Sequence, residues 1–399
     1  MDGLKKAYYR TYQQVFDIGM RCLHWRKPIV ISGAGCIRQV PDVLSKSGVT
    51  KVMVVTGSHV VKSLGPKLFA ALEDAGMPYE VFSEVEANPS VNTVEKIRTQ
   101  YLEAGCSGFV ALGGGSPMDA TKGAAARVAC PKKSCDDMAG VMRVGKTVPP
   151  IVAIPTTSGT GSETTIAAVI TDSETHHKYA LMDLKLMPLY AILDPELTVG
   201  LPPRTTATTG MDALTHAIEG YITKGAWEMS DMFHIKAIEI IAKNLRGAVN
   251  NTAEGREGMA LGQYIAGMGF SNVGLGVDHS MAHTLSAYYD TPHGKACAIL
   301  LPTVMAYNAE YTGTKYRDIA KAMGVEGVEN MTQDEYRKAA VDAVRKLAED
   351  VGIPTTLKGI VKEEDLDALS ESAYADACRP GNPRETSVEE IKELYKSLM

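Results

Sequence analysis

Two pairs of residues with helical spacing carry side chains that bind metal ions. Asp212 and His216 are four residues apart in GMDALTHAIEGY, and His279 and His283 repeat that spacing in GVDHSMAHTLSAYYDTPHG, where His293 follows in a turn. Residues four apart on a helix project from the same face. Three imidazoles and one carboxylate would supply four ligands to a divalent transition metal and leave room for a substrate oxygen.

The spacing alone does not decide which of these side chains would bind the ion. A single histidine on a helix is more often a packed or surface residue than a ligand, but two such pairs in short segments favour a metal site. Asp278 and Glu219 stand in the same two segments and are equally available as carboxylate ligands. The candidate donors therefore outnumber the positions of one four-ligand site.

A run of three glycines follows a predicted strand in the first half of the chain. Residues 109–120 read FVALGGGSPMDA, in which Ser116 and Pro117 are typical of the start of a helix. Glycines let the backbone approach a ligand closely, and a helix N-terminus suits an anionic oxygen. The run predicts a pyrophosphate site, although a tight turn without a ligand has the same composition and the spacing is not GxGxxG.

A second segment, rich in hydroxyl side chains, supports this interpretation. Residues 154–165 read IPTTSGTGSETT, again directly after a predicted strand. Its hydroxyl groups can donate hydrogen bonds to phosphate, ribose or amide groups. Both segments would lie at the carboxyl ends of parallel strands, where open α/β sheets bind ligands.

The elements that must position these segments differ between the two halves of the chain. The first half alternates β-branched runs with helical stretches, which predicts a mostly parallel sheet covered on both faces. We expect strands at 51–56, 79–83, 109–112, 151–154, 166–171 and 191–193, and helices at 60–75, 93–104 and from 116. The second half shows helical periods at 213–221, 230–248, 257–267, 316–323, 333–350 and 388–398. We therefore predict a Rossmann-like α/β dinucleotide-binding domain over residues 1–198 and an all-helical metal-binding and substrate domain over residues 199–399.

The composition argues against several classes of function. The 399 residues carry a net charge of −6 without a run of lysine or arginine, so no nucleic-acid or membrane-surface partner is expected. No stretch approaches the roughly 20 apolar residues of a membrane span, and the first residues do not read as a secretory signal. The seven scattered cysteines suit free thiols in a reducing cytoplasm.

Taken together, the motifs resemble those of the iron-containing (group III) alcohol dehydrogenases, whose members include lactaldehyde reductase and 1,3-propanediol dehydrogenase. The resemblance covers nearly the whole chain and rests on GGGSPMD, IPTTSGTGSE, GMDALTHAIEGY, DHSMAHTLSAYYDTPHG, ILLPTVMAYN and NPRETS. It implies an architecture like that of dehydroquinate synthase. It also implies a metal-dependent enzyme, forming a homodimer or larger homo-oligomer, that transfers hydride between NAD(P)(H) and a small primary alcohol or aldehyde.

The resemblance also implies roles for individual residues. The metal, Fe(II) or alternatively Zn(II), would be held by Asp212, His216, His279 and His293. His283 would be a proton relay that does not bind the metal, and Phe270 would be a wall of the substrate pocket. The implied cofactor contacts are Gly57, Ser58, Asn88, Gly114, Gly115, Ser116, Asp119, Thr156, Thr157, Thr160, Ser162, Val169 and Lys178.

One departure from the family bears on the choice of cofactor. Many NAD-preferring relatives carry an aspartate directly after the strand that here ends near Thr56, where its charge repels the 2′-phosphate of NADP. Gly57 stands at that position and Ser58 and His59 follow it. We therefore expect NADP(H) to be accepted as well as NAD(H).

Two other functions are compatible with such a chain. A dehydroquinate synthase-like lyase would need a dense set of lysines and arginines for a phosphorylated acid, and a non-catalytic assembly subunit would not need a complete ligand set. Oxidation of NAD(P)H by small aldehydes would distinguish the three.

Overall fold

The computed structural model describes residues 27–172 and 178–399, and its contacts divide them into two units. The described residues up to Gly200 form the first unit, and residues from Leu201 to Met399 form the second. Cys22, one of the predicted free thiols, lies outside the described residues, as does the amino-terminal segment in which no secretory signal is expected.

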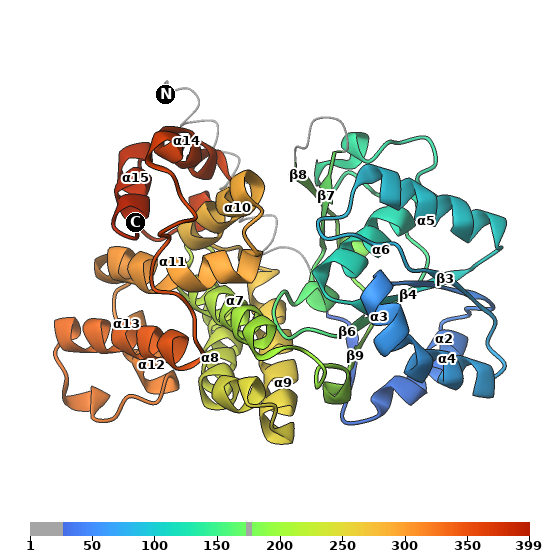
Figure 1. The fold of residues 1–399 in the computed structure, drawn as a ribbon, viewed down its shortest axis with the longest axis horizontal. Coiled ribbons are helices and arrows are strands. Elements are labelled where there is room, and N and C mark those ends of the chain that lie inside the picture. The colour runs from blue at the N-terminus through green and yellow to red at the C-terminus, as the bar shows by residue number, and fades with distance from the viewer. Residues whose placement is uncertain (1–26, 173–177) are drawn as a thin grey trace. The chain divides into compact units, whose positions relative to one another are not determined.

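A six-stranded parallel sheet forms the centre of the first unit (Figure 1). The strand order is β1-β9-β6-β4-β2-β3, and every neighbouring pair is parallel. The strands are β1 (Ile29–Ser32), β2 (Val52–Val55), β3 (Tyr79–Phe82), β4 (Gly108–Gly113), β6 (Ile151–Pro155) and β9 (Tyr190–Leu193).

Alternate residues of β2 pack against different helical layers. Val52 and Val54 belong to one apolar cluster with α2 (Val40–Lys46) and α4 (Gly65–Asp74). Met53 and Val55 belong to another cluster, with α5 (Val91–Glu103) and α6 (Gly115–Ala129). Because side chains alternate across a strand, burial on both faces requires the uninterrupted apolar run that the sequence shows. The predicted doubly covered parallel sheet is confirmed.

The segment predicted as a strand at 166–171 does not join that sheet. It forms β7 (Ala167–Thr171), which pairs antiparallel with β8 (Lys178–Met182) in a separate sheet of order β5-β8-β7, where β5 is Gly140–Val141. The connection from β6 to β7 contains one short 3₁₀ turn, Ser162–Thr164, and no α-helix, whereas a parallel crossover usually includes an α-helix.

Two predicted helices differ from those in the structure. The helix expected at 60–75 is divided into α3 (Ser58–Ser63) and α4, because Pro66 in the first turn of α4 has no N–H to continue a helical ladder. The helix α6 begins at Gly115 with Gly114 as its N-cap, so Ser116 lies inside the helix and does not cap it.

Every regular element of the second unit is helical, as predicted. The helices are α7 (Pro203–Ile222), α8 (Glu228–Val249), α9 (Ala253–Phe270), α10 (Val277–Tyr289), α11 (His293–Asn308), α12 (Lys315–Ala322), α13 (Gln333–Asp350), α14 (Leu366–Ala375) and α15 (Val388–Lys396), besides short 3₁₀ turns. One apolar cluster joins them. The helix α11 was not predicted because it is apolar on all sides and contains Pro302, so it lacks the amphipathic period of a surface helix. None of the helices in the described ranges is long and apolar enough to span a bilayer.

A candidate metal centre and a candidate cofactor site

The helices α7, α10 and α11 bring the four predicted metal ligands together. Asp212 Oδ1 lies 3.7 Å from His216 Nδ1, 3.8 Å from His279 Nε2 and 3.6 Å from His293 Nε2. The first three side chains are buried, whereas His293 is one-third exposed. One side of the group therefore stays accessible from outside the helical core.

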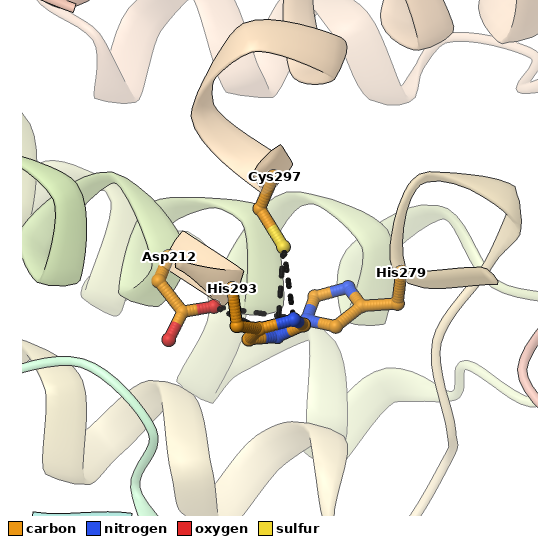
Figure 2. A group of neighbouring side chains, drawn as sticks. All are labelled: Asp212, His279, His293 and Cys297. Atoms are coloured by element: carbon orange, nitrogen blue, oxygen red, sulfur yellow. Dashed lines mark hydrogen bonds and ion pairs between the residues drawn. The ribbon is translucent and has the colours of Figure 1, made fainter. Parts of the chain in front are cut away.

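A cysteine that was not singled out from the sequence joins the group (Figure 2). Cys297 is fully buried on α11, and its Sγ lies 3.6 Å from His293 Nε2. The ligand atoms of Asp212, His279, His293 and Cys297 all lie within 4.8 Å of one another. The spacing of four residues from His293 is the signal that could have found it.

Two atoms at the centre of the group have no hydrogen-bond partner. Within residues 27–172 and 178–399, Asp212 Oδ1 and His279 Nε2 are both buried and unpartnered. A buried polar atom without a partner costs free energy, so native structures rarely leave one. A cation bound between the two atoms would satisfy both, and these residues therefore fit a divalent metal ion.

Three buried carboxylates increase the need for positive charge. The side chains of Asp212, Glu219 and Asp278 are almost wholly buried, and none of them pairs with a lysine or arginine of the described chain. Burial raises the pKa of Asp212 and of Glu219 to about 7, and it raises the pKa of Asp278 well above its ordinary value. A bound cation would reverse this effect and keep the carboxylates ionised.

Glu219 orients His279. Its Oε2 lies 2.7 Å from His279 Nδ1, and the carboxylate also accepts hydrogen bonds from the N–H groups of Gly276 and Asp278 at the start of α10. Burial, assisted by the charge of His283, lowers the pKa of His279 to about 3. The ring is therefore neutral, with its proton on the Nδ1 that faces Glu219, and the Nε2 lone pair faces Asp212.

His283 lies beside the group and is held by a carboxylate that was not predicted. Its ring stacks on that of His293 with centroids 5.3 Å apart, and its Nδ1 is 2.9 Å from Asp376 Oδ2. Burial tends to raise the pKa of Asp376, but His283 and the hydrogen bonds from Cys378 N–H and the Ser280 hydroxyl outweigh it and hold the pKa at about 2. Asp376 is 93 residues from His283, so no local spacing reveals the pair.

Phe270, the predicted wall of the substrate pocket, packs against a predicted ligand. It is the last residue of α9, and its ring stacks on His216 with centroids 4.2 Å apart and an interplanar angle of 12°. An aromatic side chain therefore covers one face of a candidate ligand.

In the first unit, the triple-glycine turn packs against the hydroxyl-rich loop. A Cβ at Gly114 would lie 3.1 Å from Thr157 Oγ1, and one at Gly115 would lie 3.2 Å from Thr160 Cγ2. Gly113 has a φ of +152°, which side chains rarely adopt. The glycines let the loop close over the start of α6 while Ser116 remains partly exposed, which fits a phosphate group at the helix N-terminus.

Asp119 and the unpredicted Lys122 tie α6 to this loop. Asp119 accepts hydrogen bonds from the Ser162 hydroxyl at 3.0 Å and from Val169 N–H at 3.2 Å. The Lys122 Nζ donates to Ser162 O, Ser162 Oγ, Thr165 Oγ1 and Ala167 O at 2.7–3.0 Å. Burial lowers the pKa of Lys122 to about 8, so it stays charged at neutral pH. The Asp119 carboxylate thus forms its hydrogen bonds within the protein, and both residues hold the hydroxyl-rich loop against α6.

The other predicted cofactor residues lie at separate places of the first unit. Gly57 precedes α3 just after β2, and Ser58 is exposed there. Asn88 has a φ of 57° and is exposed, and its carbonyl accepts a hydrogen bond from the Thr171 hydroxyl. Lys178 pairs with Thr171 in the small sheet, which brings Lys178 and Asn88 to the same end of β7. Thr156 is buried and donates its N–H to Gly113.

Comparison with known proteins shows the family to which the chain belongs. The profile described as "Iron-containing alcohol dehydrogenase" matches residues 28–195, and the one described as "Fe-containing alcohol dehydrogenase family, C-terminal" matches residues 206–399. The chain belongs to the iron-containing alcohol dehydrogenase family. This family membership confirms the predicted fold and the predicted class of reaction, NAD(P)-linked oxidoreduction between alcohols and aldehydes with a divalent metal.

Several family members are similar over nearly their full length. The chain is 46% identical to lactaldehyde reductase of Escherichia coli K12 over 91% of this chain and 96% of that protein. It is 38% identical to an NADPH-dependent butanol dehydrogenase of Clostridium saccharobutylicum over 92% and 95%. The crystal structure of a 1,3-propanediol oxidoreductase superposes with a TM-score of 0.92 at 36% identity, covering 94% of this chain and 99% of the other.

Proposed function

We propose that Asp212, His216, His279 and His293 hold the metal ion of an enzyme that interconverts a small primary alcohol and its aldehyde. The observation that carries this proposal is the unpartnered pair of buried atoms, Asp212 Oδ1 and His279 Nε2, at 3.8 Å among three buried carboxylates. When bound, the metal supplies Lewis-acid polarisation of the substrate oxygen, and the nicotinamide accepts or supplies the hydride.

The residues beside the metal ligands would manage the proton. Asp376 accepts the Nδ1–H of His283 and so leaves Nε2 as the exchangeable position. The His283 side chain is 44% exposed, which allows a proton to pass between Nε2 and solvent. We therefore assign His283 as the proton relay and Asp376 as the residue that positions it. The Phe270 ring would keep water from the substrate on the His216 side.

The cofactor would bind to the first unit. The N-terminus of α6, from Gly114 to Ser116, offers backbone N–H groups to the pyrophosphate. Hydroxyl groups of Thr157 and Thr160, which pack on these glycines, are available as further donors. We also propose that NADPH is accepted, because no carboxylate occupies positions 57–59 after β2.

The test is the oxidation of NADH and NADPH by metal-reconstituted protein with short aliphatic aldehydes, hydroxyaldehydes among them. We expect turnover with Fe(II) or Zn(II), no turnover after removal of the metal, and loss of both bound metal and turnover in Asp212→Ala. The matched control is Asp42→Ala, which removes a carboxylate from an exposed pair with Lys46. Absence of turnover across the panel in the wild type would refute the proposal.

Two broader proposals concern the compartment and the assembly of the protein. The six cysteines of the described chain form no disulfide, which supports a reducing compartment such as the cytoplasm. A homodimer or larger homo-oligomer stays a prediction, which light scattering on purified protein would check.

A further inference from the structure

Cys297 belongs to the apolar core of the second unit and also lies among the donor atoms of the metal group. Its Sγ lies 3.6 Å from His293 Nε2 and within 4.8 Å of the ligand atoms of Asp212 and His279. Figure 2 shows the thiol pointing from α11 toward the two imidazoles. Its side chain is fully buried, and the carboxyl groups of Asp212 and Asp278 are both within hydrogen-bonding reach of the thiol.

The distances within the group are those between ligands of one ion. With metal–ligand bonds of about 2.0–2.3 Å, adjacent ligand atoms of one ion lie roughly 2.8–3.8 Å apart. Asp212 Oδ1 lies 3.8 Å from His279 Nε2 and 3.6 Å from His293 Nε2, and Cys297 Sγ lies 3.6 Å from His293 Nε2. The same sulfur lies 4.0 Å from His293 Nδ1, so it sits beside the His293 ring, within 4.8 Å of the ligand atoms of Asp212 and His279.

Ligation by the thiol would require the loss of its proton, because the thiolate is the form that binds a metal ion; the proton would pass to solvent.

We propose that Cys297 Sγ is a further ligand of the metal that Asp212, His279 and His293 hold, so that the centre contains sulfur as well as nitrogen and oxygen. The inference rests on the metal centre of the proposed function. A thiolate favours softer ions. The protein should therefore bind Zn(II) and Co(II) more tightly than Mn(II), and the difference in affinity should exceed the one that the Irving–Williams order gives for nitrogen and oxygen ligands.

Spectroscopy of the Co(II)-loaded protein tests this proposal without any measurement of activity. Thiolate ligation gives an intense near-ultraviolet charge-transfer band, whereas nitrogen and oxygen ligands give only weak visible bands. We expect that band in the wild type and its loss in Cys297→Ser and Cys297→Ala, with the weak bands retained. The matched controls are Cys378→Ser, close to His283 through Asp376, and Cys106→Ser in the first unit, and both should keep the band.

Two results separate failure of this inference from failure of the proposed function. Stoichiometric Co(II) binding without the charge-transfer band, or a band that survives in Cys297→Ser, would overturn the sulfur ligand and leave the metal enzyme intact. Failure of the wild type to bind Co(II) or Zn(II) would overturn both. If the variants do not fold, X-ray absorption of the Zn(II)-loaded wild type decides, because a zinc–sulfur shell at about 2.3 Å is distinct from nitrogen and oxygen at about 2.0–2.2 Å.

Discussion

At the scale of single residues, the candidate site is a set of side chains whose hydrogen bonds orient them. Glu219 accepts the Nδ1–H of His279 and Asp376 accepts that of His283, so in both cases a carboxylate selects which ring nitrogen is presented. The two histidines lie on one helix but differ in exposure, 1% against 44%. The buried ring suits a permanent ligand, and the exposed ring suits proton exchange.

Replacement of His283 should therefore impair turnover without removing the metal. We expect His283→Ala to lower kcat by about 100-fold or more, because a positioned general acid–base group contributes a factor of that size. Asp376→Asn should also lower kcat, but by a smaller factor, because His283 itself remains. Steady-state kinetics and metal analysis on the same samples check this.

Chemical rescue distinguishes proton transfer from a structural role for His283. Added imidazole should restore part of the kcat of His283→Ala and none of the loss in Asp212→Ala. Asp334→Asn, at an almost fully exposed site, is the control for Asp376→Asn. If His283→Ala loses its metal, His283 is a ligand and the assignment as a relay is wrong.

Gly57 gives a second prediction at this scale, about the cofactor. Its φ of −95° is open to any residue, and an added Cβ would meet only Val85 O at 3.4 Å, so Gly57→Asp should fold. Its carboxylate should raise KM for NADPH by about tenfold or more, equivalent to about 1.4 kcal/mol, and leave KM for NADH nearly unchanged. Gly57→Asn is the neutral control. A wild type that already uses NADH almost exclusively would contradict the interpretation of Gly57.

At the scale of elements, the hydroxyl-rich loop depends on α6. Lys122 donates to Ser162, Thr165 and Ala167, and Asp119 accepts from Ser162 and Val169. These bonds hold the loop, and the strand that follows it, against the helix that begins at the glycine run. The cofactor site is therefore built by bonds within the protein before any cofactor binds.

Removal of the Lys122 ammonium group should destabilise the first unit. Lys122→Met leaves buried acceptors without a donor and Asp119 without its cation, which should cost about 3 kcal/mol and lower Tm by roughly 6–12 °C. Thermal unfolding followed by circular dichroism measures this, and Lys46→Met at an exposed ion pair is the control. KM for NAD(P)H should rise as well. A Tm equal to that of the control would show that the loop does not depend on Lys122.

At the scale of the whole molecule, the candidate metal ligands and the candidate cofactor residues belong to different units. The metal group draws on α7, α10 and α11 of the second unit, and the glycine run and hydroxyl loop belong to the first. Each ligand should therefore stabilise mainly its own unit.

Metal removal should lower the thermal stability of the second unit. A metal at 100 times its Kd stabilises the folded state by about 2.7 kcal/mol, so chelation should lower Tm by roughly 5–10 °C. Differential scanning calorimetry with chelator, and again after Zn(II) is restored, measures this change. NADH or NADPH should not compensate for the missing metal if the units unfold separately. An unchanged Tm on chelation would mean that the buried carboxylates do not require a cation.

The sequence by itself determined what depends on short-range periodicity. The spacing of four residues on a helix placed His216 beside Asp212, and β-branched runs followed by glycine indicated strands that lead into a ligand-binding turn. Together with the family motifs, these patterns predicted the fold class, the type of reaction and the candidate ligands.

Only the tertiary structure decided which distant segments meet. Asp376 reaches His283 across 93 residues and Lys122 reaches Ser162 across 40, and β7 pairs with β8 instead of the parallel sheet. Cys297 was within local reach of His293, but only the packing of α11 against α7 and α10 shows its thiol among the other donors. Helical and strand periods are set by the local backbone, whereas these contacts depend on how whole helices pack, and no short stretch of sequence encodes that packing.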